Sequence, residues 1–94
     1  MKRYITLLHL TEQGSKSIKQ STTRAQAFAN TAAKAGVKLE GQYWTVGSYD
    51  GVLILSAEKQ SDVLRLLVSL AAAGNVETET MEAFNAAEFD AIAK

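Results

Sequence analysis

Two segments of the chain follow the same amphipathic pattern, and this repeat constrains the fold more than any other feature. In residues 22–36, apolar side chains recur three and four positions apart, the spacing that places them on one face of an α-helix. Residues 62–74 repeat the pattern at a constant offset, and each segment closes on a glycine, Gly36 or Gly74. Because glycine readily ends helices in the left-handed conformation, the sequence predicts two helices in two equivalent halves.

Segments typical of β-strands surround the two predicted helices. They are rich in β-branched, aromatic and aliphatic residues and span residues 4–10, 37–45, 50–56 and 76–84. The order strand–helix–strand–strand–helix–strand is that of the ferredoxin-like, or split βαβ, fold. We therefore predict one α+β domain over residues 1–94, with a four-stranded antiparallel sheet that carries both helices on one face.

A short helix is also predicted at the C-terminus, over residues 84–93. Asn85 and Glu88 have the spacing of a capping box, in which each side chain bonds the other residue's backbone N–H. Phe84 and Phe89 occupy the two positions of a hydrophobic staple around that cap.

The two central strands of the predicted sheet are apolar on both faces. Ile5 and Leu7 alternate with Leu8 and Leu10, and residues 52–55 read Val-Leu-Ile-Leu. An antiparallel sheet with one face in water normally alternates apolar and polar residues. Since the two main helices cover one face only, we expect the C-terminal helix or a second copy of the chain to cover the other. The second possibility predicts a homodimer or a higher homo-oligomer.

Charge and length exclude several classes of partner. The formal net charge is zero, which argues against a nucleic-acid-binding protein that relies on phosphate contacts. The charge is divided, however, with residues 1–47 at +5 and residues 48–94 at −5, which suits complementary faces. No apolar stretch approaches the ~20 residues of a membrane span, and the N-terminus reads as a strand and not as a signal peptide. We therefore expect a cytoplasmic protein with no membrane partner.

The residue types that build common cofactor sites are scarce. The chain has one histidine and no cysteine, too few for the usual zinc sites, and it lacks glycine-rich phosphate loops. The glutamates at 77, 79 and 82 could form an all-carboxylate site, but they are better explained as protection of an edge strand. The third strand lacks the stacked aromatics of RNA-recognition domains. We expect no metal and no cofactor.

The predicted topology brings several polar and aromatic residues to one end of the sheet. That end collects the end of the first strand, the polar stretch 11–21, the turn between the second and third strands, and the corner after Gly74. Enlarged loops often carry function. The candidate ligand-binding residues there are His9, Trp44, Tyr49, Asp50 and Asn75.

The stretch YWTVGSYDG (43–51) can be explained in two ways. If the stretch is a hairpin, Gly47 is the first residue of a two-residue turn and Trp44 lies opposite Gly51. These three residues are then explained without a ligand. Asp50 is less easily explained, because aspartate is disfavoured in strands. It could cap the turn, or it could act with His9 as a general acid–base pair.

The same stretch, together with GNVETET and the closing AFNAAEF, resembles the GYD-domain family of small bacterial proteins. The resemblance covers roughly residues 4 to 89, and the family's glycine, tyrosine and aspartate fall on Gly47, Tyr49 and Asp50. It implies a ferredoxin-like fold of the kind that forms dimeric α/β barrels, and it implies no established activity. The chain departs from the family pattern at Ser56 and Glu77, where an acid and an arginine are common.

Three functions remain open from the sequence. The first is a non-catalytic module that self-associates through its open sheet face and binds a small molecule near the turn after the second strand. The second is a small cofactor-free enzyme, an oxygenase or isomerase, that uses His9 and Asp50 as acid and base. The third is a purely structural oligomer.

Overall fold

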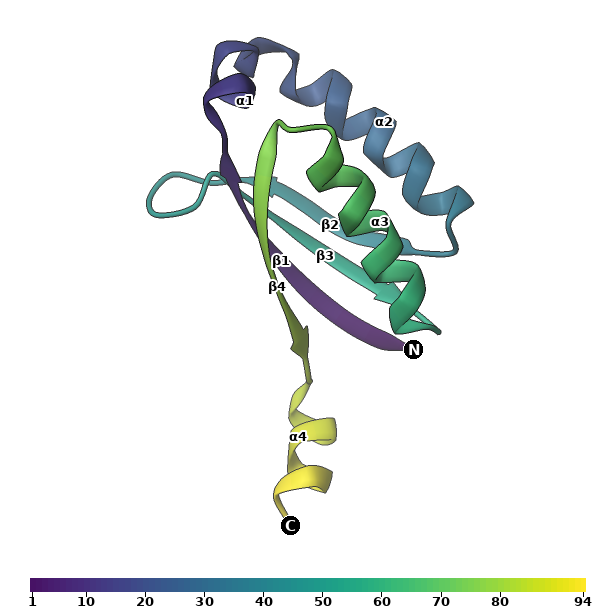
Figure 1. Ribbon diagram of the computed structural model, residues 1–94. Helices are drawn as coiled ribbons and strands as arrows, with labels where there is room; N and C mark the ends of the chain where they lie inside the picture. The colour runs from purple at the N-terminus through teal and green to yellow at the C-terminus, as the bar shows by residue number, and fades with distance from the viewer.

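A computed structural model describes all 94 residues and shows a curved sheet with helices on one side of it (Figure 1). The strands are β1 (Lys2–Leu10), β2 (Lys38–Trp44), β3 (Gly51–Ala57) and β4 (Val76–Ala83). The helices are α1 (Glu12–Lys16), the 3₁₀ turn η1 (Ile18–Gln20), α2 (Ser21–Lys34), α3 (Gln60–Ala72) and α4 (Ala86–Ala93).

The sheet is antiparallel throughout, with the strand order β2-β3-β1-β4. β1 therefore lies between β3 and β4, two strands that are separated in sequence by the whole of α3. Both long helices, α2 and α3, lie on the same face of the sheet (Figure 1). This is the predicted ferredoxin-like arrangement, and the α+β class is confirmed.

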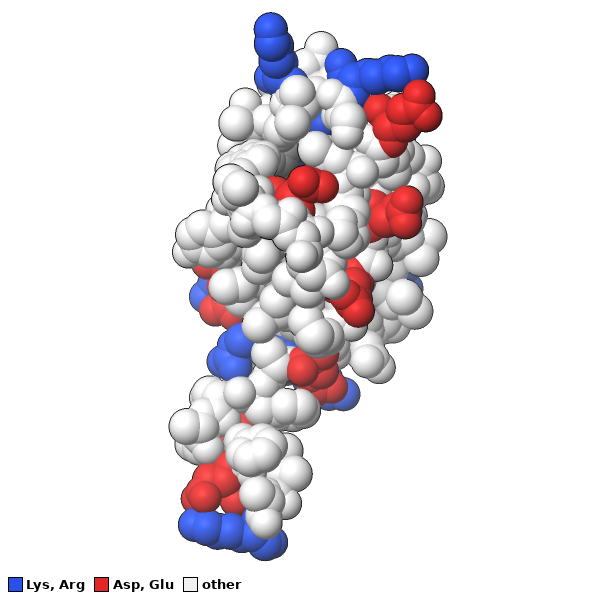
Figure 2. Space-filling model, turned by 90° about the vertical axis from the view of Figure 1, so that its left-hand side faces the viewer, with Lys and Arg blue, Asp and Glu red and all other residues white.

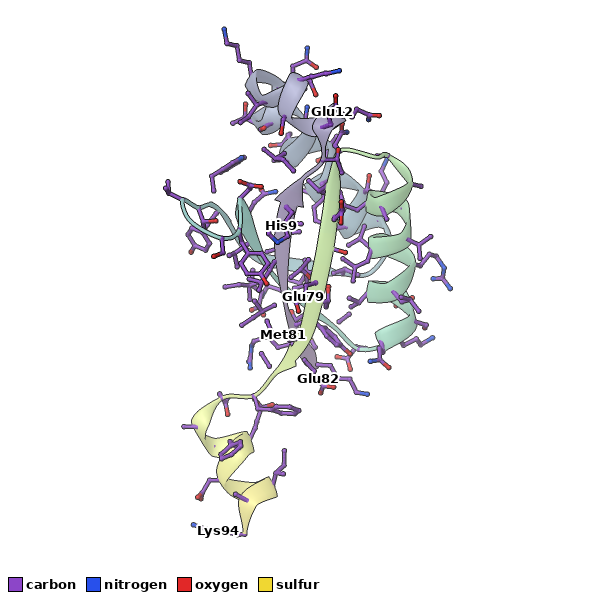
Figure 3. All side chains as sticks on the ribbon, turned by 60° about the vertical axis from the view of Figure 1, so that its left-hand side comes forward. His9, Glu12, Glu79, Met81, Glu82 and Lys94 are labelled. Atoms are coloured by element: carbon purple, nitrogen blue, oxygen red, sulfur yellow. The ribbon has the colours of Figure 1, made fainter.

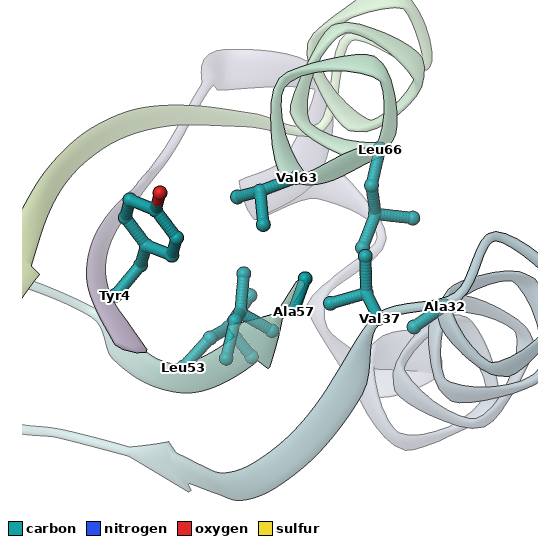
Figure 4. Packing of buried hydrophobic residues seen from close by; sticks show 8 residues of the cluster. Tyr4, Ala32, Val37, Leu53, Ala57, Val63 and Leu66 are labelled. Atoms are coloured by element: carbon teal, nitrogen blue, oxygen red, sulfur yellow. The ribbon is translucent and has the colours of Figure 1, made fainter. Parts of the chain in front are cut away.

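The hydrophobic core lies between the sheet and the two long helices, and α3 contributes more to it than α2 (Figure 4). Leu53 and Leu55 of β3 are buried with Val63 and Leu66 of α3. From α2, only Ala32 is fully buried. The first half of α2 therefore encloses the core loosely.

Both long helices end as the repeat predicts. Gly36 and Gly74 follow α2 and α3 with the same backbone angle, φ +81°. A residue with a Cβ is disfavoured in this left-handed region, so the two glycines are the residues that let the chain turn back into β2 and β4.

The polar stretch 11–21 is expected to be an enlarged loop, but most of it is helical. Thr11 caps α1 by accepting a hydrogen bond from the Gly14 N–H at 3.1 Å, and its hydroxyl donates to the Gly74 carbonyl at 2.6 Å. Gly14 lies so close to the start of β4 that a Cβ there would be 2.0 Å from the Asn75 carbonyl oxygen. The stretch is thus fixed to the body of the protein.

The connection between β2 and β3 has the predicted register but not the predicted turn. Trp44 lies opposite Gly51, and the Thr45 N–H donates to the Asp50 carbonyl at 3.0 Å. However, no backbone hydrogen bond joins Val46 to Tyr49, the pair that would close a two-residue hairpin turn. Residues 45–50 form a wider loop that extends from the sheet (Figure 1).

The face of the sheet opposite α2 and α3, called the open face below, is apolar at its centre and has no helix over it. Ile5 pairs with Ile54 and Leu7 with Val52, and all four side chains point to this face. Beside them, Tyr43 and Met81 are 60% and 46% exposed. Figure 2, which views the molecule from the left-hand side of Figure 1, shows a largely uncharged surface with several acidic residues across its middle, and with basic residues at its top, near the junction with α4 and at its lower end.

The C-terminal helix does not cover the open face. The predicted capping box of α4 is present, since Glu88 N–H donates to the Asn85 side chain and Asn85 N–H donates to the Glu88 carboxylate. The helix nevertheless points away from the sheet (Figures 1 and 3), and Phe84, Phe89 and Ile92 are 48–65% exposed. Arg3, which pairs with Glu88 at 3.2 Å, links it to β1.

The chain exposes more surface than a compact protein of its mass. Its accessible area is 6231 Å², whereas a folded monomer of 10.1 kDa is expected to expose about 5300 Å². The radius of gyration, 13.9 Å, likewise exceeds the ~12.4 Å expected for this length. No helix has the length and apolar character needed to cross a membrane.

We predict that Gly14→Ala destabilises the protein by about 1–3 kcal/mol, because the added methyl group forces α1 away from the Asn75 carbonyl. Urea denaturation followed by circular dichroism measures the change. Ser15→Ala, in the same short helix but exposed, is the matched control and should change stability by less than about 0.5 kcal/mol. Equal stability of the two variants would contradict the packing of α1 against β4.

Candidate functional site

A cleft of about 580 Å³ opens between the first half of α2, the last half of α3 and the upper end of the sheet. Its walls are mostly apolar, and its volume lies within the range of small-molecule sites. Each of the three walls contributes a large apolar side chain: Phe28 from α2, Trp44 from β2 and Leu70 from α3. The cleft occupies the end of the molecule at which the sequence predicts the loops to converge.

Three of the five candidate residues line this cleft: Trp44, Asp50 and Asn75. Trp44 shares the helix-covered side of the sheet with Leu53, as the register predicts, and its side chain is 57% exposed. The Asn75 side chain accepts a hydrogen bond from the Gln13 amide at 3.0 Å, which ties α1 to the rim of the cleft.

Asp50 completes the pairing of β1 with β3 beyond the last regular residue pair. Its N–H donates to the Leu8 carbonyl at 2.7 Å, and its carboxylate accepts the Leu10 N–H at 2.8 Å. A side chain here takes the place of a backbone acceptor. This explains an aspartate at the start of a strand in structural terms.

The other two candidates, His9 and Tyr49, lie on the opposite side of the sheet. The His9 ring packs on the Tyr49 ring with centroids 4.4 Å apart and planes tilted by 35°. The Tyr49 hydroxyl donates to the Glu79 carboxylate of β4 at 2.6 Å (Figure 3 labels His9 and Glu79). This chain of contacts holds the loop 45–50 over the open face.

His9 and Asp50 do not form the predicted acid–base pair. No hydrogen bond or ion pair joins them, because His9 follows Leu7 onto the open face whereas the Asp50 carboxylate is bonded to the β1 backbone. The structure thus brings His9 together with Tyr49, and it places Asp50 beside the cleft. No group of three or more His, Cys, Asp or Glu side chains converges in a way that could hold a metal ion.

Sequence reasoning missed Arg24, which lines the cleft from α2. The available signal was its spacing, because Ser21, Ala25 and Phe28 lie three and four positions apart around it and also line the cleft. The helical stripe predicts core positions only for the apolar residues of this face, and it predicts no role for the arginine between them.

The contact with Glu79 raises the pKa of the Tyr49 phenol above its ordinary value, mainly because the hydrogen bond and then the nearby negative charge favour the neutral phenol. Since the folded-state pKa is the higher one, this contact stabilises the fold below the unfolded-state pKa of about 10. That stabilisation is lost as the pH rises through the folded-state pKa.

We predict that Glu79→Gln lowers the pKa of Tyr49 towards that of a free phenol. Phenolate absorbance measured against pH gives the value, with Tyr49→Phe used to subtract the signal of the other tyrosines. Glu77→Gln removes a neighbouring exposed carboxylate that does not bond Tyr49, and it should leave the pKa nearly unchanged. A Tyr49 pKa that is the same in Glu79→Gln and in the native chain would contradict the contact.

Comparison with solved structures shows the same fold in two other proteins. The crystal structure of TTHA0845 from Thermus thermophilus aligns with a TM-score of 0.59 at 22% identity, over 92% of this chain and 96% of that one. The crystal structure of MtbAldR aligns with a TM-score of 0.61 at 15% identity, over 89% of this chain but only 52% of that one.

Sequence comparison shows the family. A protein of Thermus thermophilus named glutamine synthetase and cystathionine beta-lyase binding protein is 32% identical over 89 residues, which cover 94% of each chain. The family model of the GYD domain matches residues 4–93. The chain therefore belongs to the GYD-domain family, as the resemblance of its YWTVGSYDG stretch predicts.

Proposed function

We propose that this chain is a non-catalytic binding module that works by associating with proteins, first of all with a second copy of itself. The observation that carries the proposal is the open face: an apolar sheet surface that neither the long helices nor α4 covers. The relative named for binding two enzymes supports a binding role. The ionisable groups at the upper end have structural partners, since Asp50 bonds the Leu10 N–H and Glu79 bonds Tyr49, and this favours binding over acid–base catalysis.

The amount of excess surface fits a partner of the chain's own size. The chain exposes about 950 Å² more than a compact monomer of its mass, and a standard interface removes about 800 Å² from each partner. Only 12 of 94 residues are buried, so the isolated chain has a small core for its length. A second copy that packs sheet on sheet would supply the missing burial.

The C-terminal helix also favours a second copy of the chain as the partner. An isolated helix of eight residues is marginal in water, and α4 makes few contacts within its own chain. Phe89 and Ile92 are 63% and 65% exposed, which leaves α4 an apolar side without a partner. Two-fold symmetry would let each α4 pack on the neighbouring copy, because a two-fold interface uses the same surface patches on both subunits.

We expect the native chain to be a dimer or a higher oligomer by light scattering coupled to size exclusion, and Ile54→Lys to shift it towards the monomer. The substitution places a charge in the centre of the proposed interface, where an unpaired charge is costly. Phe89→Asp tests the contribution of α4 in the same way.

The matched controls are Val68→Lys for Ile54→Lys and Val68→Asp for Phe89→Asp, each of which adds the same charge to an exposed apolar position on α3. They should leave the molar mass unchanged. Circular dichroism shows that each variant remains folded; if Ile54→Lys does not fold, Met81→Lys at the exposed border of the open face replaces it. A native chain that stays monomeric at high micromolar concentration would refute self-association.

The name of the relative also supports a second kind of partner, a metabolic enzyme. We expect the purified chain to form a saturable complex with the glutamine synthetase or the cystathionine beta-lyase of its own organism, measured by surface plasmon resonance. An unrelated enzyme of similar charge is the control. If both enzymes fail to bind a correctly folded chain, the enzyme-binding part of the proposal is wrong, whatever the oligomeric state.

A small molecule is the third partner, and we place its site in the cleft lined by Trp44, Asp50 and Asn75. The volume and the mostly apolar walls support this placement. It lies on the other side of the sheet from the open face, so a ligand and a second copy would not compete for the same surface.

A further inference from the structure

The cleft between α2 and the sheet is lined by one positively and one negatively charged side chain that do not pair with each other. Of the residues that line it, Arg24 is the one cation and Asp50 the one anion. Asp50 already accepts the Leu10 N–H and forms no ion pair with Arg24. The Arg24 guanidinium therefore has no carboxylate paired with it inside the cleft.

Arg24 is also the only arginine of the chain without a carboxylate partner. Arg3 pairs with Glu88 and Arg65 pairs with Asp62, each at 3.2 Å. Arg24 instead donates to uncharged acceptors: the carbonyl of Ser17, between α1 and η1, at 2.8 Å, the Ser17 hydroxyl at 2.9 Å, and the hydroxyl of Ser21, the first residue of α2, at 3.4 Å. These bonds orient the guanidinium but leave its charge unpaired.

The guanidinium keeps donors available for a further partner. It has five N–H groups, and the three bonds to Ser17 and Ser21 leave the Nε–H and one other group free. The residue is half-buried, so a partner there is partly shielded from water. Such a geometry favours a planar anion, because arginine binds carboxylates with two parallel hydrogen bonds.

The rest of the cleft indicates the body of the ligand. Phe28 and Trp44 offer aromatic surfaces, and Leu53, Leu66 and Leu70 add aliphatic ones. A hydrophilic anion would leave these walls without a partner, whereas an apolar body would bury them.

We propose that the cleft binds an apolar carboxylic acid, with its carboxylate on Arg24 and its aromatic or branched body between α2 and the sheet. The proposal rests on the small-molecule part of the proposed function and names the ligand class for it. It makes Arg24 the residue that selects the ligand and Trp44 a residue that contacts it.

Isothermal titration with three matched probes tests the ligand class. They are biphenylacetate, its primary amide and the corresponding amine. We expect the carboxylate to bind at least about tenfold more tightly than the amide, because a hydrogen bond between charged groups is stronger than one to a neutral amide. The amine should bind most weakly, because it brings a second positive charge to Arg24.

Arg24→Gln should remove the preference for the carboxylate while leaving the affinity for the amide nearly unchanged. Arg24→Lys keeps the charge but not the forked geometry, and it should retain part of the preference; it also serves if Arg24→Gln does not fold. Arg65→Gln removes an arginine whose side chain is 73% exposed on α3, away from the cleft, and it should behave like the native chain.

Each other result would overturn the proposal in a recognisable way. Equal binding of acid and amide, or a carboxylate preference that survives Arg24→Gln, would refute the role of Arg24 but keep a small-molecule site. Preferred binding of the amine would refute the carboxylate as the ligand class and would indicate that Asp50 selects the ligand. Absence of binding by all three probes would remove the site itself, and light scattering of the same samples reports separately on self-association.

Discussion

The pairing of β1 with β3 is the interaction on which the rest of the structure depends. These strands form the centre of the sheet, and both are apolar on their two faces. One face forms the core with α3, and the other face carries Ile5, Leu7, Val52 and Ile54. Because the chain has no further element that lies over it, the same two strands that build the core also present an apolar surface without a partner. The same strand pair thus underlies both the fold and the self-association that we propose.

The alternation of side chains along β1 explains why the candidate site separates into two parts. Neighbouring residues of a strand point to opposite faces, so His9 and Leu10 cannot both face the cleft. His9 follows Leu7 to the open face, where it meets Tyr49, while the backbone of Leu10 is bound by Asp50. Residues that the topology places at the same end of a sheet can therefore lie on opposite faces of it.

Much of the fold could be predicted because its signals are local and periodic. The two helices, their glycine ends, the order of elements, the Trp44–Gly51 register and the capping box at Asn85 all follow from short spacings. The helical form of residues 11–21 could not be predicted, because it depends on Thr11 bonding the distant Gly74 carbonyl. The wide loop 45–50 could not be predicted for the same reason, because Tyr49 is held by Glu79, thirty positions away in the sequence.

The cleft itself follows from the composition of α2, although its presence is visible only once the layers are assembled. α3 presents Val63, Leu66 and Leu67 to the sheet, and these side chains fill the space between the layers. The inner face of α2 is mainly alanine, with Phe28 as its one large apolar side chain, so it cannot fill the same space. Protein interiors are otherwise close-packed, and an apolar volume of this size is costly to leave against water. The two helices share one sequence template, but one closes the core and the other leaves room for a ligand beside an arginine whose charge is unpaired.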